Sequence, residues 1–183
     1  MKIISLVPIG RVDRGLLEPL AEGLTQRLQV ACSIQPKGLE AEFAYNALRR
    51  QYHSTEILKK LLARRTGECW KVLGVTEMDL YIPVLTFVFG EAHTADGGAV
   101  VSAYRLRQEF YGLPADPELL RGRLLKESLH ELGHTYGLRH CADYLCVMSA
   151  SYGVERVDLK RAEFCPACAQ ALSAKEVGLS TTP

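Results

Sequence analysis

Residues 116–140 read DPELLRGRLLKESLHELGHTYGLRH, and this stretch predicts a long helix that ends beside a group of histidines. Asp116 is a good helix cap, and Pro117 suits the first helical position because its missing N–H costs nothing there. We expect the helix to run to about Tyr136. Gly137 ends it, because glycine adopts the left-handed conformation that turns a chain back.

The histidines of this stretch have the spacing of a metal site. His130 and His134 are four residues apart, so their rings lie on one helical face. The turn at Gly137 allows His140 to supply a third nitrogen, and Glu131 can reach a metal-bound water without being a ligand. Three protein nitrogens with an open fourth position are typical of catalytic zinc. The alternative is that these histidines merely cap and pack the end of a helix.

Four of the six cysteines follow this helix as a second group with metal spacing. They are Cys141, Cys146, Cys165 and Cys168. A Cys-x₄-Cys pair with a Cys-x₂-Cys pair is typical of a closed, four-thiolate structural zinc site. Disulfides and an iron–sulfur cluster are the alternatives, but such clustering in a reducing compartment favours zinc. The sequence therefore predicts two zinc ions.

The order of motifs from residue 130 to residue 168 resembles the archaemetzincin family of metzincin zinc peptidases. The histidine motif HELGHTYGLRH is followed at once by Cys141, then by Cys146 and Met148, and finally by Cys165-Pro166-Ala167-Cys168. The resemblance implies that His130, His134 and His140 are the catalytic zinc ligands and that Glu131 is the general base and acid. It also makes Met148 the Met-turn residue, an apolar floor beneath the metal.

Alternating apolar runs predict strands and helices in the first half of the chain. We expect strands at Ile3–Val7 and Val30–Ile34 around a helix at Gly15–Leu28, followed by a second helix capped by Ser54. Together with the strands that follow, this order indicates an α/β (mixed α+β) fold in which helices pack on a mixed sheet.

Three further strands are predicted before the long helix, at Val72–Ile82, Val84–Phe89 and Ala99–Leu106. The turn residues Asp96-Gly97-Gly98 lie between the last two, so we expect an antiparallel hairpin. A terminal helix is predicted at about Cys165–Lys175.

The family resemblance refines this fold to a twisted, mixed, five-stranded sheet with an antiparallel edge strand and the active-site helix below it. By position the edge strand would span Thr86–Ala92 and bind peptide substrate by main-chain pairing. We expect one metzincin-like catalytic domain over residues 1–183. Its N-terminal subdomain covers residues 1–137, and a small C-terminal subdomain with the four-cysteine zinc site covers residues 138–183.

Composition excludes several kinds of partner. The net charge of +1 gives no basic field for nucleic acid. The uncharged run Leu80–Gly90 is much shorter than the roughly 20 residues of a membrane helix, and the N-terminus lacks the features of a secretory leader. We therefore expect a cytoplasmic monomer that has neither nucleic-acid nor membrane partners.

The function that fits these motifs is zinc-dependent hydrolysis of peptide bonds in peptide or protein substrates, with Glu131 serving the zinc-bound water. The alternative is a zinc-stabilised cytoplasmic peptide-binding module whose catalytic site is vestigial or weakly metallated. Glu131 argues against this alternative, because a module that only binds peptides has no chemical need of that carboxylate.

Overall fold

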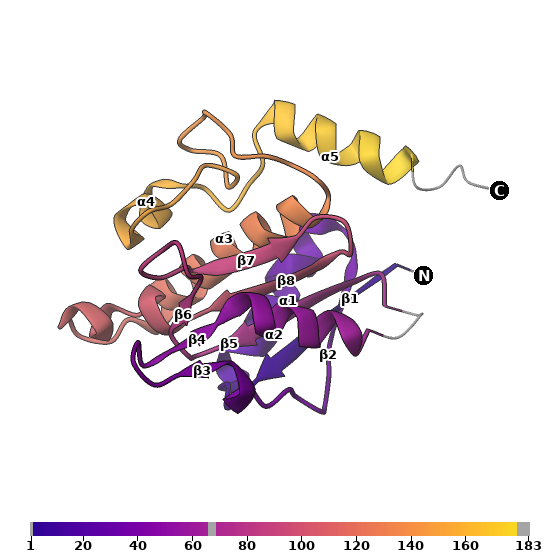
Figure 1. Ribbon diagram of the computed structural model, residues 1–183. Coiled ribbons are helices and arrows are strands. Elements are labelled where there is room, and N and C mark those ends of the chain that lie inside the picture. The colour runs from indigo at the N-terminus through magenta and orange to yellow at the C-terminus, as the bar shows by residue number, and fades with distance from the viewer. Residues whose placement is uncertain (1, 66–68, 179–183) are drawn as a thin grey trace.

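The computed structural model describes residues 2–65 and 69–178 and has the predicted mixed α/β architecture (Figure 1). Met1 and residues 179–183, which belong to the two predicted subdomains, lie outside the described residues. Five strands form the main sheet in the order β2-β1-β5-β8-β7. Four of them are parallel and β7, at one edge, is antiparallel. The predicted five-stranded sheet with an antiparallel edge is confirmed.

The first three elements follow the predicted order. Strand β1 (Ile3–Ile9) leads into α1 (Arg14–Leu28), and β2 (Ala31–Ile34) returns to pair in parallel with β1. The leucines of α1 are buried against the sheet and against the long helix, so the amphipathic pattern of the sequence sets its orientation.

An antiparallel hairpin forms around the predicted turn, but its first strand lies beyond the predicted Val84–Phe89. Strand β5 (Lys71–Thr76) pairs with β8 (Gly98–Ser102), which pairs antiparallel with the edge strand β7 (Gly90–His93). The edge strand is therefore not Thr86–Ala92.

The prediction of a strand at Val84–Phe89 is wrong. Only Val88 of this segment forms a bridge, to Leu80. Pro83 has no N–H to donate to a ladder, and the carbonyl oxygens of Leu85 and Thr86 accept hydrogen bonds from the Arg49 side chain. The Arg49 side chain, distant in the sequence, thus binds carbonyl groups that would pair with a neighbouring strand in the predicted structure.

A second, three-stranded sheet was not predicted. It has the order β3-β4-β6, with β3 at Tyr45–Asn46, β4 at Gln51–His53 and β6 at Leu80–Tyr81. The single strand predicted at Val72–Ile82 is therefore divided between two sheets. Strands of two or three residues are too short to produce a period-2 pattern.

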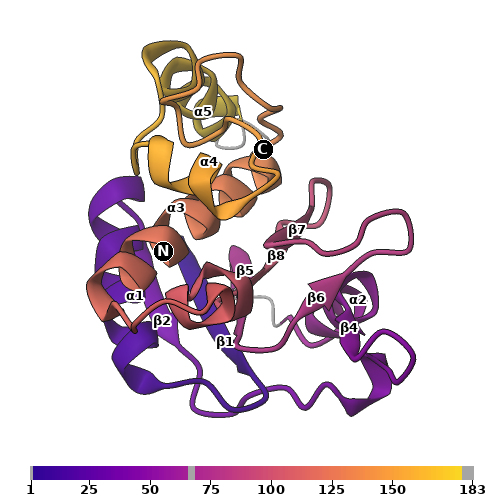
Figure 2. The ribbon, with the colours of Figure 1, turned by 90° about the vertical axis from the view of Figure 1, so that its left-hand side faces the viewer.

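Helix α2 (Ser54–Ala63) follows β4 and packs on the main sheet opposite α1 and α3 (Figure 2). Ser54 is not its cap, because His53 occupies that position. The Ser54 hydroxyl instead hydrogen bonds to the Tyr81 carbonyl at 3.2 Å and to the Glu91 carboxylate. This serine therefore attaches the helix to the edge strand β7.

The long helix α3 (Pro117–Thr135) forms as predicted. Asp116 accepts a hydrogen bond from the Leu119 N–H at 2.9 Å, and Gly137 has a φ of 77° in the turn that ends the helix. Two more helices follow, α4 (Val154–Leu159), which was not predicted, and α5 (Pro166–Gly178). Three short 3₁₀ turns occur at Glu42–Ala44, Tyr104–Leu106 and Gln108–Tyr111.

Helix α3 lies between the main sheet and the C-terminal segment that carries α4 and α5 (Figures 1 and 2). It is covered from both sides, so it buries polar side chains as well as leucines. Within residues 2–65 and 69–178, no helix combines the length and apolar character needed to cross a membrane.

Candidate metal centres

A cavity of about 330 Å³ lies between the segment that precedes β7, helix α3 and the loop before α4. It is lined by Leu85, Thr86, Phe87, Val88, Phe89, Gly90, Glu127, His130, Glu131, His140, Ala150, Ser151 and Tyr152. Two hollows elsewhere, of about 410 and 710 Å³, contain none of the predicted site residues among the described residues that line them. His130, Glu131 and His140 therefore line this cavity, whereas Cys146 and Cys165 line a separate hollow of about 150 Å³.

Three histidines converge at this cavity. One potential ligand atom from each of His130, His134 and His140 lies within 4.8 Å of the other two. The Nε2 atoms of His130 and His134 are 3.1 Å apart, and His140 reaches them from beyond the turn at Gly137. The structure thus brings together the predicted histidines in an arrangement that could hold one metal ion.

Backbone carbonyls orient the two helical histidines. Nδ1 of His130 lies 2.8 Å from the Val147 carbonyl oxygen, and Nδ1 of His134 lies 2.8 Å from that of Leu138. A carbonyl only accepts, so each Nδ1 carries the proton and each Nε2 keeps a free lone pair. This is the tautomer that a metal ligand needs.

The environment keeps these rings neutral. Burial lowers the pKa of His130 to about 3, and the nearby Lys160 ammonium acts in the same direction. Burial also lowers the pKa of His134. Since only a neutral imidazole binds a metal ion, both rings are in the binding form at neutral pH.

Glu131 lines the same cavity and is only 7% exposed. Burial raises its pKa well above the usual value, the Glu127 carboxylate adds to this effect, and Lys160 opposes it. A carboxyl group whose pKa is raised holds a transferred proton more firmly than an exposed one. Glu131 is therefore suited to acid–base work.

A buried ion pair reaches the cavity through Glu127, and it was not predicted from the sequence. Lys160 Nζ lies 2.7 Å from Glu127 Oε1, with both side chains almost fully buried. Lys160 also donates to the Ser149 carbonyl at 3.1 Å. Glu127 precedes His130 and Glu131 by three and four residues, a helical spacing that could have indicated it, whereas no sequence pattern pointed to Lys160.

Met148 is fully buried beneath helix α3. A Cβ atom added at Gly133 would overlap the Met148 sulfur, so the thioether packs directly on the helix between His130 and His134. The Met148 carbonyl accepts a hydrogen bond from the Cys141 N–H at 2.9 Å. The methionine thus connects the histidine cluster with the cysteine cluster.

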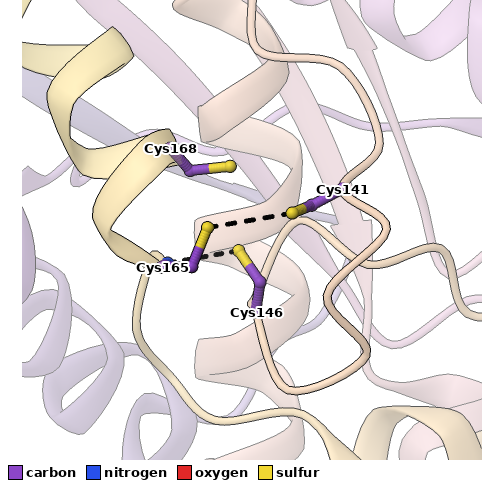
Figure 3. A group of neighbouring side chains, drawn as sticks. All are labelled: Cys141, Cys146, Cys165 and Cys168. Atoms are coloured by element: carbon purple, nitrogen blue, oxygen red, sulfur yellow. Dashed lines mark hydrogen bonds between the residues drawn. The ribbon is translucent and has the colours of Figure 1, made fainter.

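The four C-terminal cysteines form the second cluster (Figure 3). One sulfur from each of Cys141, Cys146, Cys165 and Cys168 lies within 4.8 Å of the others, and all six cysteines of the chain are free. The Cys141 and Cys165 sulfurs are 3.8 Å apart, and the Cys165 N–H donates to the Cys146 sulfur at 3.3 Å. Four converging thiols could hold a zinc ion in a closed, tetrahedral site.

Comparison with known proteins gives one consistent result. The sequence profile described as Peptidase family M54 matches residues 31–174. An archaemetzincin of Methanocaldococcus jannaschii is 41% identical over 177 residues, which cover 97% of this chain and 96% of the relative. An archaemetzincin of Thermococcus kodakarensis is 40% identical over 179 residues, which cover 94% of this chain and 96% of the relative.

Solved structures agree with these sequence matches. A zinc-dependent peptidase from Methanocorpusculum labreanum superposes with a TM-score of 0.85 at 34% identity, covering 92% of this chain and 99% of the other. The archaemetzincin from Methanopyrus kandleri superposes with a TM-score of 0.82 at 38% identity, covering 96% of each chain.

Proposed function

The chain belongs to peptidase family M54 and is a zinc metallopeptidase, and we propose that His130, His134 and His140 hold its catalytic zinc while Glu131 is the general base and acid. One observation carries this assignment. Potential ligand nitrogens of the three histidines lie within 4.8 Å of one another beside the cavity that Glu131 lines, and the Nε2 atoms of His130 and His134 keep free lone pairs.

The chemistry divides between the metal and the chain. When bound, zinc would supply a Lewis acid that lowers the pKa of a water towards neutrality and polarises the scissile carbonyl. Glu131 accepts the proton of the attacking water and delivers it to the leaving amine. Its buried position holds the carboxyl group beside the reacting atoms and restricts competing solvent.

We assign a second, structural zinc to Cys141, Cys146, Cys165 and Cys168, which makes two zinc ions in total. Support comes from the four converging sulfurs and from the closed character of a four-thiolate site. This ion would join the loop after α3 to the start of α5. In doing so it would fix the segment that carries His140 and Met148.

Met148 is assigned as the apolar floor of the histidine site, in line with the metzincin clan, which this chain resembles in its histidine motif. Its full burial against Gly133 supports this role. The substrates are peptides or proteins, as for a peptidase. In the same clan-based proposal, the edge strand β7 would pair with their main chain.

We further propose one catalytic domain over residues 1–183 that works as a cytoplasmic monomer. Clustered free cysteines fit a reducing compartment, where thiols are not oxidised to disulfides, and this supports the location. The alternative of a peptide-binding module with a vestigial site has lost its support, because the family is one of peptidases.

The proposed ligands are tested by metal content. His134→Gln should remove one zinc and leave the cysteine-bound zinc in place, whereas the control His93→Gln, at the exposed end of β7, should keep both. Hydrolysis of a mixed peptide library, read by mass spectrometry, should follow the histidine-bound zinc. Equal zinc content in the two variants would refute the ligand assignment.

A further inference from the structure

The upper wall of the active-site cavity is an irregular segment, residues 85–89, between β6 and β7. Backbone hydrogen bonds hold its C-terminal part. The Val88 N–H donates to the Leu80 carbonyl at 2.9 Å, and the Phe89 carbonyl accepts from Ser102 at 2.8 Å. At its start, the Leu85 N–H donates to the Ile82 carbonyl at 3.1 Å, while the carbonyls of Leu85 and Thr86 accept from side chains.

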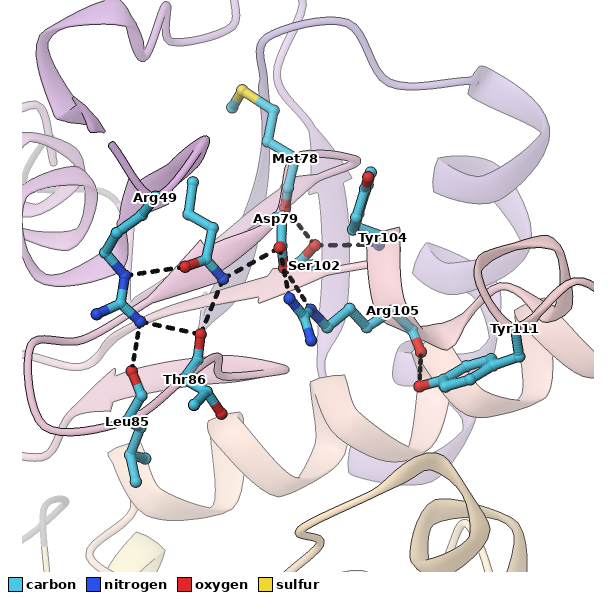
Figure 4. Close-up of polar contacts among 10 residues, drawn as sticks. Arg49, Met78, Asp79, Leu85, Thr86, Ser102, Tyr104, Arg105 and Tyr111 are labelled. Atoms are coloured by element: carbon cyan, nitrogen blue, oxygen red, sulfur yellow. Dashed lines mark hydrogen bonds and ion pairs between the residues drawn. The ribbon is translucent and has the colours of Figure 1, made fainter. Parts of the chain in front are cut away.

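Two side chains hold the carbonyls of those residues, that of Arg49 in the turn after β3 and that of Gln51 in β4. Figure 4 shows Arg49 beside Leu85 and Thr86. Arg49 Nη2 donates to the Leu85 carbonyl at 2.7 Å and to the Thr86 carbonyl at 3.0 Å. Gln51 Nε2 donates to the same Thr86 carbonyl at 2.9 Å. Arg49 Nε also donates to Gln51 Oε1 at 2.9 Å, so the two side chains orient each other.

An aspartate–arginine pair extends this network towards the cavity. Gln51 donates to Asp79 Oδ2 at 3.0 Å, and Arg105 binds both Asp79 oxygens at 2.7 and 2.8 Å. The Arg105 guanidinium lies 4.4 Å from the ring centre of Phe87, a wall residue. The carbonyl groups of Leu85 and Thr86 and the ring of Phe87 are thus in contact with one connected group of polar and charged side chains.

Contacts outside the cavity wall also fix the position of Arg49. Its backbone N–H donates to Asn46 Oδ1 at 3.1 Å in the turn between β3 and β4, and its guanidinium lies 4.2 Å from the Tyr81 ring centre. A side chain fixed in this way loses little further entropy when it binds the wall carbonyls.

We propose that Arg49 is a positioning residue for substrate binding. With Gln51, Asp79 and Arg105 it forms the Arg49 network, which fixes residues 85–87 in the shape that receives a peptide. The inference rests on the proposed peptidase function. None of these four residues lines the cavity, so the network should govern peptide affinity and leave the proton transfers of Glu131 unchanged.

The test compares Arg49→Gln with Arg50→Gln. Both variants lose one positive charge at adjacent positions, but Arg50 is exposed and takes no part in the network. For a library-derived peptide, Arg49→Gln should raise KM roughly tenfold and change kcat by less than about twofold, because only binding interactions are lost. Arg49→Lys, which keeps the charge and one set of donors, should recover part of the loss.

A second measurement does not depend on activity. Amide hydrogen exchange at Leu85, whose N–H donates to the Ile82 carbonyl at 3.1 Å, should quicken at least tenfold in Arg49→Gln and stay unchanged in Arg50→Gln. Equal KM and equal exchange in the two variants would overturn the proposal, as would a fall in kcat with unchanged KM. If the wild-type protein cleaves no peptide, the proposed function fails, while the exchange data still decide whether Arg49 positions the wall.

Discussion

The proposed zinc ligands differ in what holds them. His130 and His134 are each oriented by a backbone carbonyl, of Val147 and of Leu138 respectively. Both carbonyls belong to the segment that follows α3. This segment therefore sets the orientation of the two histidine rings on the helix. His140 is exposed and depends on the turn at Gly137 for its position.

Gly133 gives a residue-scale prediction, because it lies where helix α3 meets Met148. In Gly133→Ala the new Cβ atom would overlap the Met148 sulfur, and such overpacking typically costs about 1–3 kcal/mol. Denaturant unfolding should show this loss, and zinc analysis should show a weaker histidine site.

Gly122→Ala is the matched control on the same helix. Open space surrounds that position, so alanine should raise the free energy of unfolding by about 0.5–1 kcal/mol through helix propensity. If both alanine variants are equally stable, Met148 does not pack on the helix as described.

At the scale of elements, local signals predicted helices better than strands. The ends of α3 follow from Asp116 and Gly137, whose effects act within one turn. The segment 84–89 failed as a strand because Arg49, distant in sequence, binds its carbonyls. Strands β3, β4 and β6 are stabilised by tertiary pairing that no local pattern records.

The Glu127–Lys160 pair joins α3 to the end of α4 and gives an element-scale prediction. Lys160→Met leaves a buried carboxylate without its partner, which costs about 3–5 kcal/mol. The double variant Glu127→Leu with Lys160→Met should regain most of this stability, because an apolar pair can fill the same buried space. Urea unfolding measures all three proteins.

Arg27→Met provides the control for this pair. Arg27 and Glu163 are about half exposed and 2.8 Å apart, so their separation should cost less than about 1 kcal/mol. A Lys160→Met protein no less stable than Arg27→Met would show that the buried pair does not hold the elements together.

At the scale of the whole molecule, the metal-site residues could be predicted from the sequence, but most of the residues that surround them could not. The histidine and cysteine spacings predicted two clusters that the fold brings together. Lys160, the Arg49 network and the cavity wall could not be foreseen, because each comes from a segment without a motif. Their place in the site depends on how the second sheet and α4 pack, which only the complete fold determines.

Cys165→Ser tests the proposed structural zinc at this scale. Loss of one thiolate opens the closed site, so the second zinc should be lost and the melting temperature should fall with it. Activity should decline because the segment with His140 is no longer fixed. Cys32→Ser, outside both clusters, is the control and should keep both zinc ions. Wild-type melting and full zinc content in Cys165→Ser would contradict the structural role.

The most direct test of the central claim is a paired measurement on Glu131→Gln. The amide matches the carboxylate in size, so packing and zinc content should stay at wild-type values, but it cannot accept the proton of water. Peptide turnover should fall about 10²- to 10⁴-fold, the typical contribution of general acid–base catalysis. Zinc is measured by elemental analysis and turnover on a library-derived peptide. Lost activity with intact zinc is the predicted result, whereas unchanged turnover, or loss of zinc together with activity, would contradict the account.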